Sequence, residues 1–232
     1  MEKKNGICDT KSCFLCKNCL PEWQPAIAAQ KRNLKIKKNE LIFKEGDPVT
    51  GIYFVYSGNV KVFKKWDNDK ELILRFAKEG AILGHRGLGK SSTYPISAAA
   101  LETAVVCYMD MDFFEATLKV NTDFTYKLLM FFAVELQESE RRMRNLAHMP
   151  VKGRVAEALL ALKDQFGTTP EGVINIELMW QDMASYAGAT YETVFRVVTE
   201  LTKENIITTA GKKIRIINLE KLTEITTENR LL

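Results

Sequence analysis

The spacing of three small or branched residues near the C-terminus constrains the fold of this chain more than any other feature. Ala184, Gly188 and Val194 follow one another at intervals of four and six residues. A small side chain suits the point where two helices cross, and glycine suits the tight turn that follows because it adopts backbone conformations that other residues avoid. Val194 then reaches the core contact of a second helix, with Val197 on the same face. This spacing predicts a helix-turn-helix over residues 180–197, in which two helices meet at about 120°.

The second helix of this unit carries side chains suited to reading DNA bases. Thr190 can cap its N-terminus, with Thr193 in the first turn. Glu192 and Arg196 lie four residues apart and therefore share one helical face. Glutamate can accept from the amino group of cytosine and arginine can donate twice to guanine, although the same spacing also fits an ordinary surface ion pair. The expected exposed residues of this helix are Tyr191, Glu192, Phe195 and Arg196.

A short β-rich segment follows the helix. Residues 206–209 and 214–217 are rich in isoleucine and threonine, and they flank Gly211. This pattern predicts a hairpin whose tip carries Lys212 and Lys213, two cations that can contact DNA phosphates. The C-terminal domain is therefore predicted to be a winged helix-turn-helix that binds double-stranded DNA.

The first half of the chain has the pattern of short β-strands. Its β-branched and aromatic segments are separated by turn-forming residues, such as those at positions 46–48 and 57–59. Several short strands at this spacing predict a β-sandwich or jelly roll. A short helix that ends near Asn33 is expected to precede them. The expected strands cover residues 41–43, 51–56, 60–63, 72–76 and 104–108.

A long amphipathic helix is predicted over residues 121–147. Apolar residues recur every seven positions and again three positions after each, with Ser139 as the one polar member. Such a seam fits either a helix packed on its own domain or a parallel coiled coil between two copies. We favour the dimer because the charged residues of the segment gather on another face. The seam consists of Leu129, Phe132, Leu136, Ser139, Met143 and Leu146, and the charged face of Glu138, Glu140, Arg141, Arg142 and Arg144.

Together these patterns predict an α+β protein with two domains and a linking helix. At 232 residues the chain is long enough for two modest cores. Pro150 breaks the helical pattern and marks the start of the C-terminal domain. The predicted segments are a cysteine-bearing N-terminal segment (1–33), a β-barrel sensor domain (34–120), a dimerisation helix with its hinge (121–149) and the winged helix-turn-helix domain (150–232).

Composition places few limits on the partners. The net charge of +4 is too small to indicate nucleic-acid binding by itself, because a sum over the chain says little about a local patch. The sequence has no run of eighteen apolar residues, so we expect no membrane partner. The first residues lead into a cysteine cluster rather than an apolar segment, and we therefore expect a cytoplasmic protein without a signal peptide.

Four of the five cysteines are crowded between positions 8 and 19. In a cytosolic chain such crowding indicates metal or redox chemistry before disulfides. Soft thiolates select iron–sulfur clusters or zinc over hard cations. A zinc site of the Cys₄ type remains an alternative, as does a purely buried role for the distant cysteine. The candidate ligands are Cys8, Cys13, Cys16, Cys19 and Cys107.

Over essentially its whole length the chain resembles the Crp/Fnr transcription regulators. Residues 188–196 are similar to the recognition helix of that family, and residues 145–147 with 153–156 resemble its hinge and following helix. The glutamate and arginine that read G·C pairs in the family match Glu192 and Arg196. The resemblance implies a cyclic-nucleotide-binding-type β jelly roll in front of the DNA-binding domain. It further implies a homodimer on a palindromic operator, contact with RNA polymerase and no enzymatic activity.

Three positions depart from the family pattern. Tyr191 stands where arginine or valine is usual, and Phe195 replaces a small or hydroxyl-bearing residue. These two changes leave the outer bases of the operator open. Pro150 replaces the aspartate of the hinge, which implies a stiffer hinge than in the catabolite activator.

The sensory domain also departs from the cyclic-nucleotide pocket of the family. His85 and Arg86 follow Gly84 where the family has a glutamate, and Pro95 and Ile96 stand in place of an arginine and a serine. The acceptor for the ribose and the arginine for the phosphate are therefore both missing. The comparison implies that cyclic AMP does not bind well.

The cysteines resemble those of the oxygen-sensing Fnr branch, in which three N-terminal cysteines and one distant cysteine hold a four-iron cluster. Residues 101–107 look like the segment around the distant ligand, and Cys13 and Cys19 match a six-residue step of that branch. The implied ligands of a 4Fe-4S cluster are Cys13, Cys19 and Cys107 with one of Cys8 or Cys16.

The resemblance also implies how such a cluster would act. An intact cluster would favour the dimer and DNA binding, and oxygen or nitric oxide would reverse both through a coupling free energy of a few kcal/mol. The alternatives are a regulator of the same family with zinc, heme, a small molecule or no cofactor. An electron carrier that uses the same cysteines is the most distant alternative, because the sequence has no second cluster motif.

Overall fold

The computed structural model describes residues 12–67, 70–90 and 92–227. The candidate ligand Cys8 lies outside these residues. The chain divides into two compact units, Met1–Leu136 and Gln137–Leu232. The division falls within helix α3 (Thr122–His148), which is the predicted long helix.

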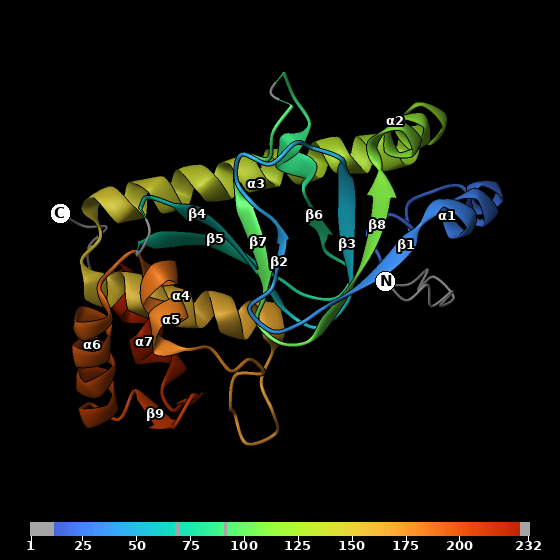
Figure 1. Ribbon diagram of the computed structural model, residues 1–232. Coiled ribbons are helices and arrows are strands. Elements are labelled where there is room, and N and C mark those ends of the chain that lie inside the picture. Colours follow the sequence, from blue (N-terminus) through green and yellow to red (C-terminus); the bar gives the residue numbers. More distant parts are fainter. Residues whose placement is uncertain (1–11, 68–69, 91, 228–232) are drawn as a thin grey trace. The chain divides into compact units, whose positions relative to one another are not determined.

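The first unit is built on two four-stranded antiparallel sheets (Figure 1). One sheet has the order β1 (Arg32–Ile36), β8 (Ala104–Asp110), β3 (Gly51–Ser57) and β6 (Ile82–Leu83). The other has the order β2 (Leu41–Phe43), β7 (Ser97–Ala100), β4 (Val60–Lys65) and β5 (Glu71–Ala77). All five predicted strands are present, and they form the expected sandwich.

Strand β3 is buried on both of its faces. Tyr53 and Val55 belong to the core of the sandwich, whereas Ile52 and Phe54 point to a second apolar cluster beneath the helices. Successive residues of a strand point to opposite faces, so a strand buried on both sides has a continuous apolar run rather than an alternating one.

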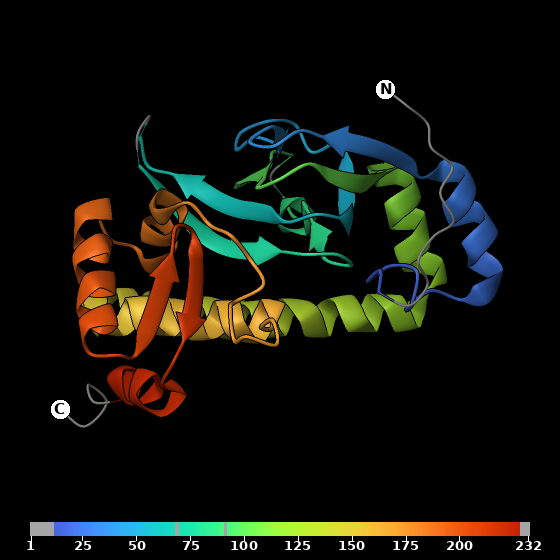
Figure 2. The ribbon, with the colours of Figure 1, turned by 90° about the horizontal axis from the view of Figure 1, so that it is seen from below.

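Short helices close one end of the first unit. Helices α1 (Gln24–Gln30) and α2 (Met111–Val120) lie side by side there, as both views show (Figures 1 and 2). The turn η1 (Pro21–Trp23) precedes α1, and the Trp23 ring stacks on Phe113 with the ring centroids 5.7 Å apart. The Asp110 carboxylate caps α2 by accepting from the Phe113 amide at 2.9 Å. Helix α2 has no counterpart among the predicted elements.

Two features of the first unit differ from the prediction. The helix expected to end near Asn33 ends at Gln30, and the chain enters β1 at Arg32 because this segment pairs with β8. Strand β7 is a run of one serine and three alanines, which has little intrinsic preference for a strand. It forms nevertheless because β2 and β4 pair on either side of it.

The second unit contains the predicted helix-turn-helix and hairpin. Helix α5 ends at Gly188, which has φ of +63°, the left-handed conformation for which glycine was expected at this position. Ala184 and Val194 are completely buried, as their spacing predicts. The elements after α3 are α4 (Val151–Phe166), α5 (Trp180–Ala187), α6 (Tyr191–Lys203), β9 (Ile207–Ala210), β10 (Lys213–Ile216) and α7 (Leu219–Thr227).

These elements confirm the predicted α+β class, with a β-rich N-terminal domain, a long helix and a C-terminal helix-turn-helix. Among the residues that the structure describes, none of the helices combines the length and the apolar character that a membrane crossing requires.

Candidate DNA interface and sensory site

Helix α6 has one buried and one exposed face. Val194, Val197 and Leu201 are buried in the second unit, as expected for apolar residues three and four positions apart. The Thr190 hydroxyl accepts a hydrogen bond from the Thr193 amide at 3.3 Å. This bond caps the N-terminus of α6 as predicted and fixes where the helix begins.

The exposed face of α6 carries the predicted base-reading side chains. Tyr191, Glu192, Phe195 and Arg196 are all exposed. The rings of Tyr191 and Phe195 stack on each other, with centroids 6.1 Å apart and an angle of 15° between their planes. Glu192 and Arg196 lie beside this pair with the same four-residue spacing. One helical face can therefore offer a carboxylate, a guanidinium and two aromatic rings to a DNA groove.

Strands β9 and β10 form the predicted hairpin with a two-residue turn. Gly211 in that turn has φ of +62°, a conformation that favours glycine. Lys212 and Lys213 are exposed at the tip. The Lys213 ammonium lies 3.9 Å from the Glu177 carboxylate, and both side chains are more than half exposed, so this ion pair is weak. The tip thus presents two cations that solvent or phosphate can reach.

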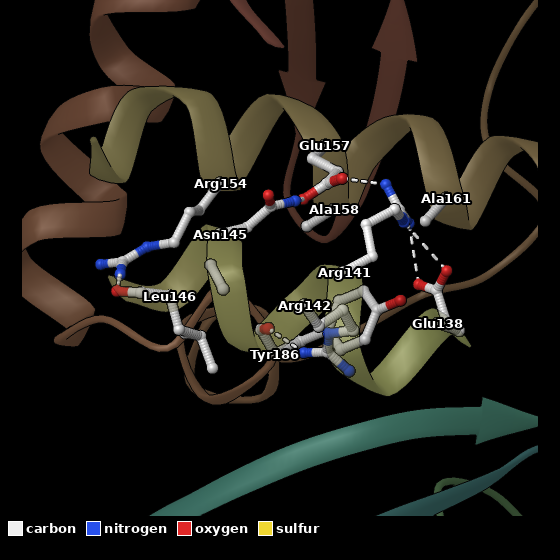
Figure 3. A pocket seen from close by; sticks show the side chains of 11 residues that line it. Glu138, Arg141, Arg142, Asn145, Leu146, Arg154, Glu157, Ala158, Ala161 and Tyr186 are labelled. Carbon is white, nitrogen blue, oxygen red and sulfur yellow. Dashed lines mark hydrogen bonds and ion pairs between the residues drawn. The ribbon is translucent and has the colours of Figure 1, made fainter. Parts of the chain in front are cut away.

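A polar pocket lies in the second unit where the end of α3 meets α4 and α5 (Figure 3). Arg141 pairs with Glu138 on its own helix and with Glu157 of α4. The Asn145 side chain donates to the same Glu157 carboxylate at 2.7 Å. Arg154 of α4 donates to the backbone carbonyl oxygen of residue 146 at 2.9 Å. Because carboxylates and carbonyl oxygens engage these polar groups, the pocket stabilises the junction and offers little to an anionic ligand.

The charged face of α3 is therefore only partly solvated. Arg142 donates to the backbone carbonyl oxygen of Tyr186 at 2.8 Å and lies over the ring of the same residue, 4.6 Å from its centroid. Arg141 and Arg142 are both half-buried. A stripe of charged residues on a helix usually faces solvent. Here α4 and α5 supply partners for these side chains, and the local sequence does not reveal those partners.

The N-terminal cysteines lie in a turn-rich segment that is fastened to the first unit. The Phe14 amide donates to the Gly80 carbonyl oxygen at 2.9 Å, and the Leu20 amide donates to the Asn121 side chain at 2.8 Å. The side chain of Gln24 donates to the Cys16 carbonyl oxygen at 2.6 Å. Hydrogen bonds to the distant Gly80 and Asn121, and a local one from Gln24, thus hold the cysteine segment in one position.

Three of the candidate ligands meet around one apolar pocket of the first unit. Cys13 and Cys16 line it from the N-terminal segment, and Cys107 lines it from β8. The Cys107 thiol donates to the side-chain oxygen of Asn33 at 3.2 Å. Cys19 does not line the pocket, although it belongs to the same apolar cluster. Sequence positions nearly one hundred residues apart are thereby brought together.

The chemistry of these thiols sets a condition on metal binding. Burial, followed by the neighbouring Cys13, raises the pKa of Cys19 to about 12, so its thiol is protonated at neutral pH. Metal ligation requires the thiolate, and a bound metal would have to displace this proton. Within the described residues, no three Cys, His, Asp or Glu side chains are close enough to hold a metal ion. The four cysteines share one neighbourhood and supply suitable donors, but a cluster would have to draw them closer.

A partly buried ion cluster joins α3 to the sandwich within the first unit. The Glu135 carboxylate lies 3.0 Å from Arg75 Nε of β5 and 2.8 Å from His85 Nε2. It also lies 3.2 Å from Arg86 Nε, and the turn η2 (His85–Gly87) carries both of these last two partners. His85 is almost completely buried. One carboxylate is therefore the shared partner of two arginines and a histidine at this point of the barrel.

The protonation states in this cluster follow from burial and from charge. Burial alone would raise the pKa of Glu135, but the hydrogen bond with His85 and the charges of Arg75 and Arg86 lower it to about 2. Burial lowers the pKa of His85, and the Glu135 hydrogen bond only partly opposes this. Glu135 is therefore ionised at neutral pH, and the two arginines are its principal counter-charges.

Helix α3 exposes an apolar stripe. The exposed fractions are 63% for Leu129, 61% for Leu136 and 63% for Met143, and these residues lie seven positions apart. Two other members of the predicted seam have partners within their own units. Phe132 is half-buried with its ring 5.3 Å from that of His85, and Leu146 lines the polar pocket of the second unit.

The sequence patterns did not single out Glu135 or Arg75. The available signal was one carboxylate next to Phe131 and Phe132, on a side of the long helix that is otherwise apolar. A charge in such a position needs a buried partner. Its partners come from positions about fifty and sixty residues earlier, and local periodicity cannot identify them.

Two family models match the chain. Residues 33–121 match the cyclic nucleotide-binding domain, and residues 153–225 match the Crp-like helix-turn-helix domain. The first match covers the β-sandwich, and the second covers α4 to α7. Both agree with the division of the fold into a β-rich domain and a helix-turn-helix domain.

Known proteins are similar to the chain over most of their length. Transcriptional activator protein Anr of Pseudomonas aeruginosa is 27% identical over 216 residues, which cover 90% of this chain and 88% of that protein. The cAMP-activated global transcriptional regulator CRP of Salmonella typhimurium is 30% identical over 186 residues, which cover 78% of this chain and 87% of that protein. The solved structure of FixK2 from Bradyrhizobium japonicum has a TM-score of 0.75 at 24% identity, over 84% of this chain and 96% of that one, and it supports the fold.

The low pKa of Glu135 predicts a specific dependence of stability on pH. The pKa of this carboxyl group is lowered on folding from 4.5 to about 2, so its contribution to stability is present above pH 4.5 and is lost as the pH falls through the folded value. We expect Glu135→Gln to lower the free energy of unfolding at pH 7 by about 3 kcal/mol, because it removes the carboxylate that faces two partly buried arginines. The difference from the unaltered protein should shrink steadily as the pH falls from 5 towards 2.

The measurement is urea-induced unfolding of both proteins at a series of pH values. Glu140→Gln is the matched control, because it makes the same change at an exposed position of the same helix. It should change the free energy of unfolding by less than about 0.5 kcal/mol. The proposed ionisation would be contradicted if the free energies of unfolding of Glu135→Gln and the unaltered protein differed by the same amount from pH 7 to pH 3.

Proposed function

Because the chain belongs to the Crp/Fnr family of transcription regulators, as its resemblance predicted, we propose that two copies of it bind a palindromic DNA operator and that this binding responds to oxygen or redox state. The family is made up of DNA-binding transcription regulators and not of enzymes. The observation that carries the proposal is the exposed face of α6 with Glu192 and Arg196, the two residues that the resemblance matches to the base-reading glutamate and arginine of the family.

The side chains of α6 suit direct readout of G·C pairs. Arg196 can donate two hydrogen bonds to guanine, and Glu192 can accept one from cytosine, from neighbouring positions on one face. Thr190 and Thr193 lie at the N-terminus of the helix, where hydroxyl and amide groups can meet a phosphate. Lys212 and Lys213 would add contacts with phosphate from the hairpin tip, and these would be independent of sequence. Base contacts would then select the operator, and phosphate contacts would position the protein on it.

A dimer would form along the exposed stripe of α3. Leu129, Leu136 and Met143 are each more than 60% exposed, and large apolar side chains repeated on one helical face usually cover a partner. Phe132 and Leu146 would contribute less than the heptad pattern predicted, because each already packs within its own unit. Two parallel copies of α3 would give the two-fold symmetry that a palindromic operator requires, with half-sites about 34 Å apart. RNA polymerase would be the further partner of such a regulator.

The N-terminal cysteines support a sensory role. The relatives called Anr and FnrA are transcriptional activators, and they are 27% and 26% identical to this chain. The cysteines of this chain resemble those of the Fnr branch of the family. We infer a 4Fe-4S cluster on Cys13, Cys19 and Cys107 with one of Cys8 or Cys16. Cys16 is the candidate among the described residues, because it lines the same pocket as Cys13 and Cys107. Such a group would supply an oxygen-sensitive link between the N-terminal segment and β8. The protein would contribute the apolar surroundings, which limit the access of water to the thiolates.

The partly buried ion cluster argues against cyclic AMP as the effector. A cyclic nucleotide brings a phosphate that requires a cation, but Arg75 and Arg86 are already paired with Glu135. The similarity to CRP, a regulator named for its activation by cAMP, therefore need not extend to its effector.

Reading of G·C pairs by α6 predicts different effects for two basic residues. Arg196→Ala should weaken binding to a G·C-containing operator by about 1–3 kcal/mol and flatten the base preference. Lys212→Ala should weaken binding to all duplexes alike and lower the slope of log affinity against log salt by about one. The measurement is fluorescence anisotropy over a salt series, with an operator selected from randomised duplexes. If Arg196→Ala kept both its affinity and its base preference, α6 would not be the reading helix.

The apolar stripe of α3 predicts the effect of a charge at its centre. Leu136→Glu would place two carboxylates against each other across the two-fold axis and should yield monomers. Sedimentation velocity under anaerobic conditions measures this directly. Leu41→Glu is the matched control, because Leu41 is an exposed leucine on β2 away from the stripe, and it should leave the dimer intact. An unchanged dimer in Leu136→Glu would place the interface elsewhere.

The pocket around Cys107 predicts a loss of cofactor without a loss of fold. Serine is nearly the same size as cysteine, but it is a poor ligand for iron, so Cys107→Ser should abolish the colour and the bound iron of anaerobically purified protein. Cys13→Ser and Cys19→Ser should behave alike, whereas only one of Cys8→Ser and Cys16→Ser should do so. The measurements are iron and sulfide content, the visible spectrum, and circular dichroism as the control for folding.

Other outcomes of this experiment would identify the alternatives. Full iron content with an oxygen-stable colour in Cys107→Ser would leave Cys107 as a half-buried thiol bonded to Asn33. A colourless protein that contains zinc would indicate a structural metal site, and a sharp Soret band would indicate heme.

A further inference from the structure

Two aromatic rings on the reading face of α6 have no role in the contacts described so far. Tyr191 and Phe195 remain 40% and 51% exposed although their rings stack on each other. Large aromatic side chains on a protein surface normally bury most of their area, and exposed ones commonly mark a place of contact. Both residues also replace the side chains that are usual in the family at these positions.

The stability of the helix does not account for this pair. An aromatic pair four residues apart contributes only a few tenths of a kcal/mol to a helix. Small or hydroxyl-bearing residues would serve the helix as well and would expose less apolar surface. The core of the second unit does not depend on the pair either, because Val194, Val197 and Leu201 fill the buried face of α6.

The position of the pair indicates its target. Tyr191 and Glu192 are neighbours in the chain, as are Phe195 and Arg196, and each step of one residue turns the helix by about 100°. The aromatic stripe therefore runs parallel to the charged stripe, over the same first turns of the helix that enter the major groove. Bases contacted by the aromatic stripe would flank the bases that Glu192 and Arg196 read.

The major groove offers one apolar group to such a surface, the 5-methyl group of thymine. A phenylalanine ring has no hydrogen-bonding atoms, so it gains nothing from the amino and carbonyl groups of the other base edges. Contact between a ring and a methyl group buries apolar area on both sides. A ring in this position therefore favours thymine over cytosine, which presents an amino group and no methyl group.

We propose that Tyr191 and Phe195 form a thymine-reading surface, whose rings contact the 5-methyl groups of thymines flanking the G·C pairs read by Glu192 and Arg196. This inference rests on the proposed function of α6 and adds the identity of the outer bases. Its occupant is duplex DNA rather than a protein partner. Two rings make a small apolar patch, whereas a stable protein interface needs a larger one, and the adjoining Glu192 and Arg196 belong to the same groove-facing surface.

The test removes methyl groups from DNA without changing its base pairing. An operator is first selected from randomised duplexes by the full-length protein under anaerobic conditions. Each thymine of one half-site is then replaced in turn by deoxyuridine, which pairs identically but lacks the 5-methyl group. Anisotropy titrations should show that deoxyuridine at one or two positions beside the G·C pairs lowers the affinity about three- to fivefold. This is the effect expected when one buried methyl group is lost. Deoxyuridine at the other positions should have no effect.

Variants of the protein then assign that effect to the rings. Phe195→Ala should bind the thymine operator more weakly and should lose its sensitivity to deoxyuridine at the affected position. Tyr191→Phe keeps the ring without the hydroxyl and should retain full sensitivity. Trp66→Ala is the matched control, because Trp66 is an 89% exposed aromatic residue of the first unit, and it should behave as the unaltered protein. The midpoint of thermal unfolding checks that each variant is folded.

Three results would overturn the inference. The first is equal affinity of the unaltered protein for thymine and deoxyuridine duplexes at every position. The second is a Phe195→Ala variant that binds all duplexes more weakly yet keeps the deoxyuridine effect, which would make the pair structural. The third is a Phe195→Ala variant with unaltered DNA binding, which would point to a protein partner instead. In each case, if Arg196→Ala still flattens the base preference, the proposed DNA-binding function stands. If Arg196→Ala leaves the base preference unchanged, that function is overturned too.

Discussion

The orientation of α3 in the first unit depends on one mostly buried carboxylate, together with the buried Phe124 and Leu128 of the same helix. Glu135 is the common partner of a histidine and two arginines, and a buried charge without partners costs several kcal/mol. A rotation of the helix that separated Glu135 from Arg75 and His85 is therefore strongly unfavourable. The same orientation leaves Leu129 and Leu136 exposed. The ion cluster thus determines which side of the helix is offered to a second copy, and the dimer that we propose depends on it.

The sequence predicts those strands whose own residues favour extended structure. Strand β4 (Val60–Lys65) contains valines and a phenylalanine, and its turns are marked by glycine and asparagine. Strand β7 (Ser97–Ala100) could not be predicted in this way, because alanine prefers helices and the strand exists only through its pairing with β2 and β4. In the same way, the spacing from Ala184 to Val194 predicted the helix-turn-helix, because packing at that crossing is local in sequence.

Long-range partners explain what could not be predicted at the candidate sites. A heptad pattern shows which residues share a face, but not whether a second copy or the same chain covers them. Phe132 belongs to the same predicted seam as Leu129 and Met143, yet its ring packs against His85. Arg141 has the position of a solvated surface charge, yet its partner Glu157 comes from the next helix. Base-reading positions were easier to predict, because exposure on α6 follows directly from the burial of its other face.

The effector cannot be inferred from overall similarity. The chain is 27% identical to Anr and 30% identical to CRP, so the two kinds of regulator are about equally distant, and a few residues have to decide between them. In the sensory domain Arg75 and Arg86 both lie against Glu135. The Cys107 thiol donates to Asn33 beside the pocket that Cys13 also lines. A signal at the cysteines would also act on the segment that packs against β8. The choice of effector therefore depends on the partners of these few side chains and not on the overall identity.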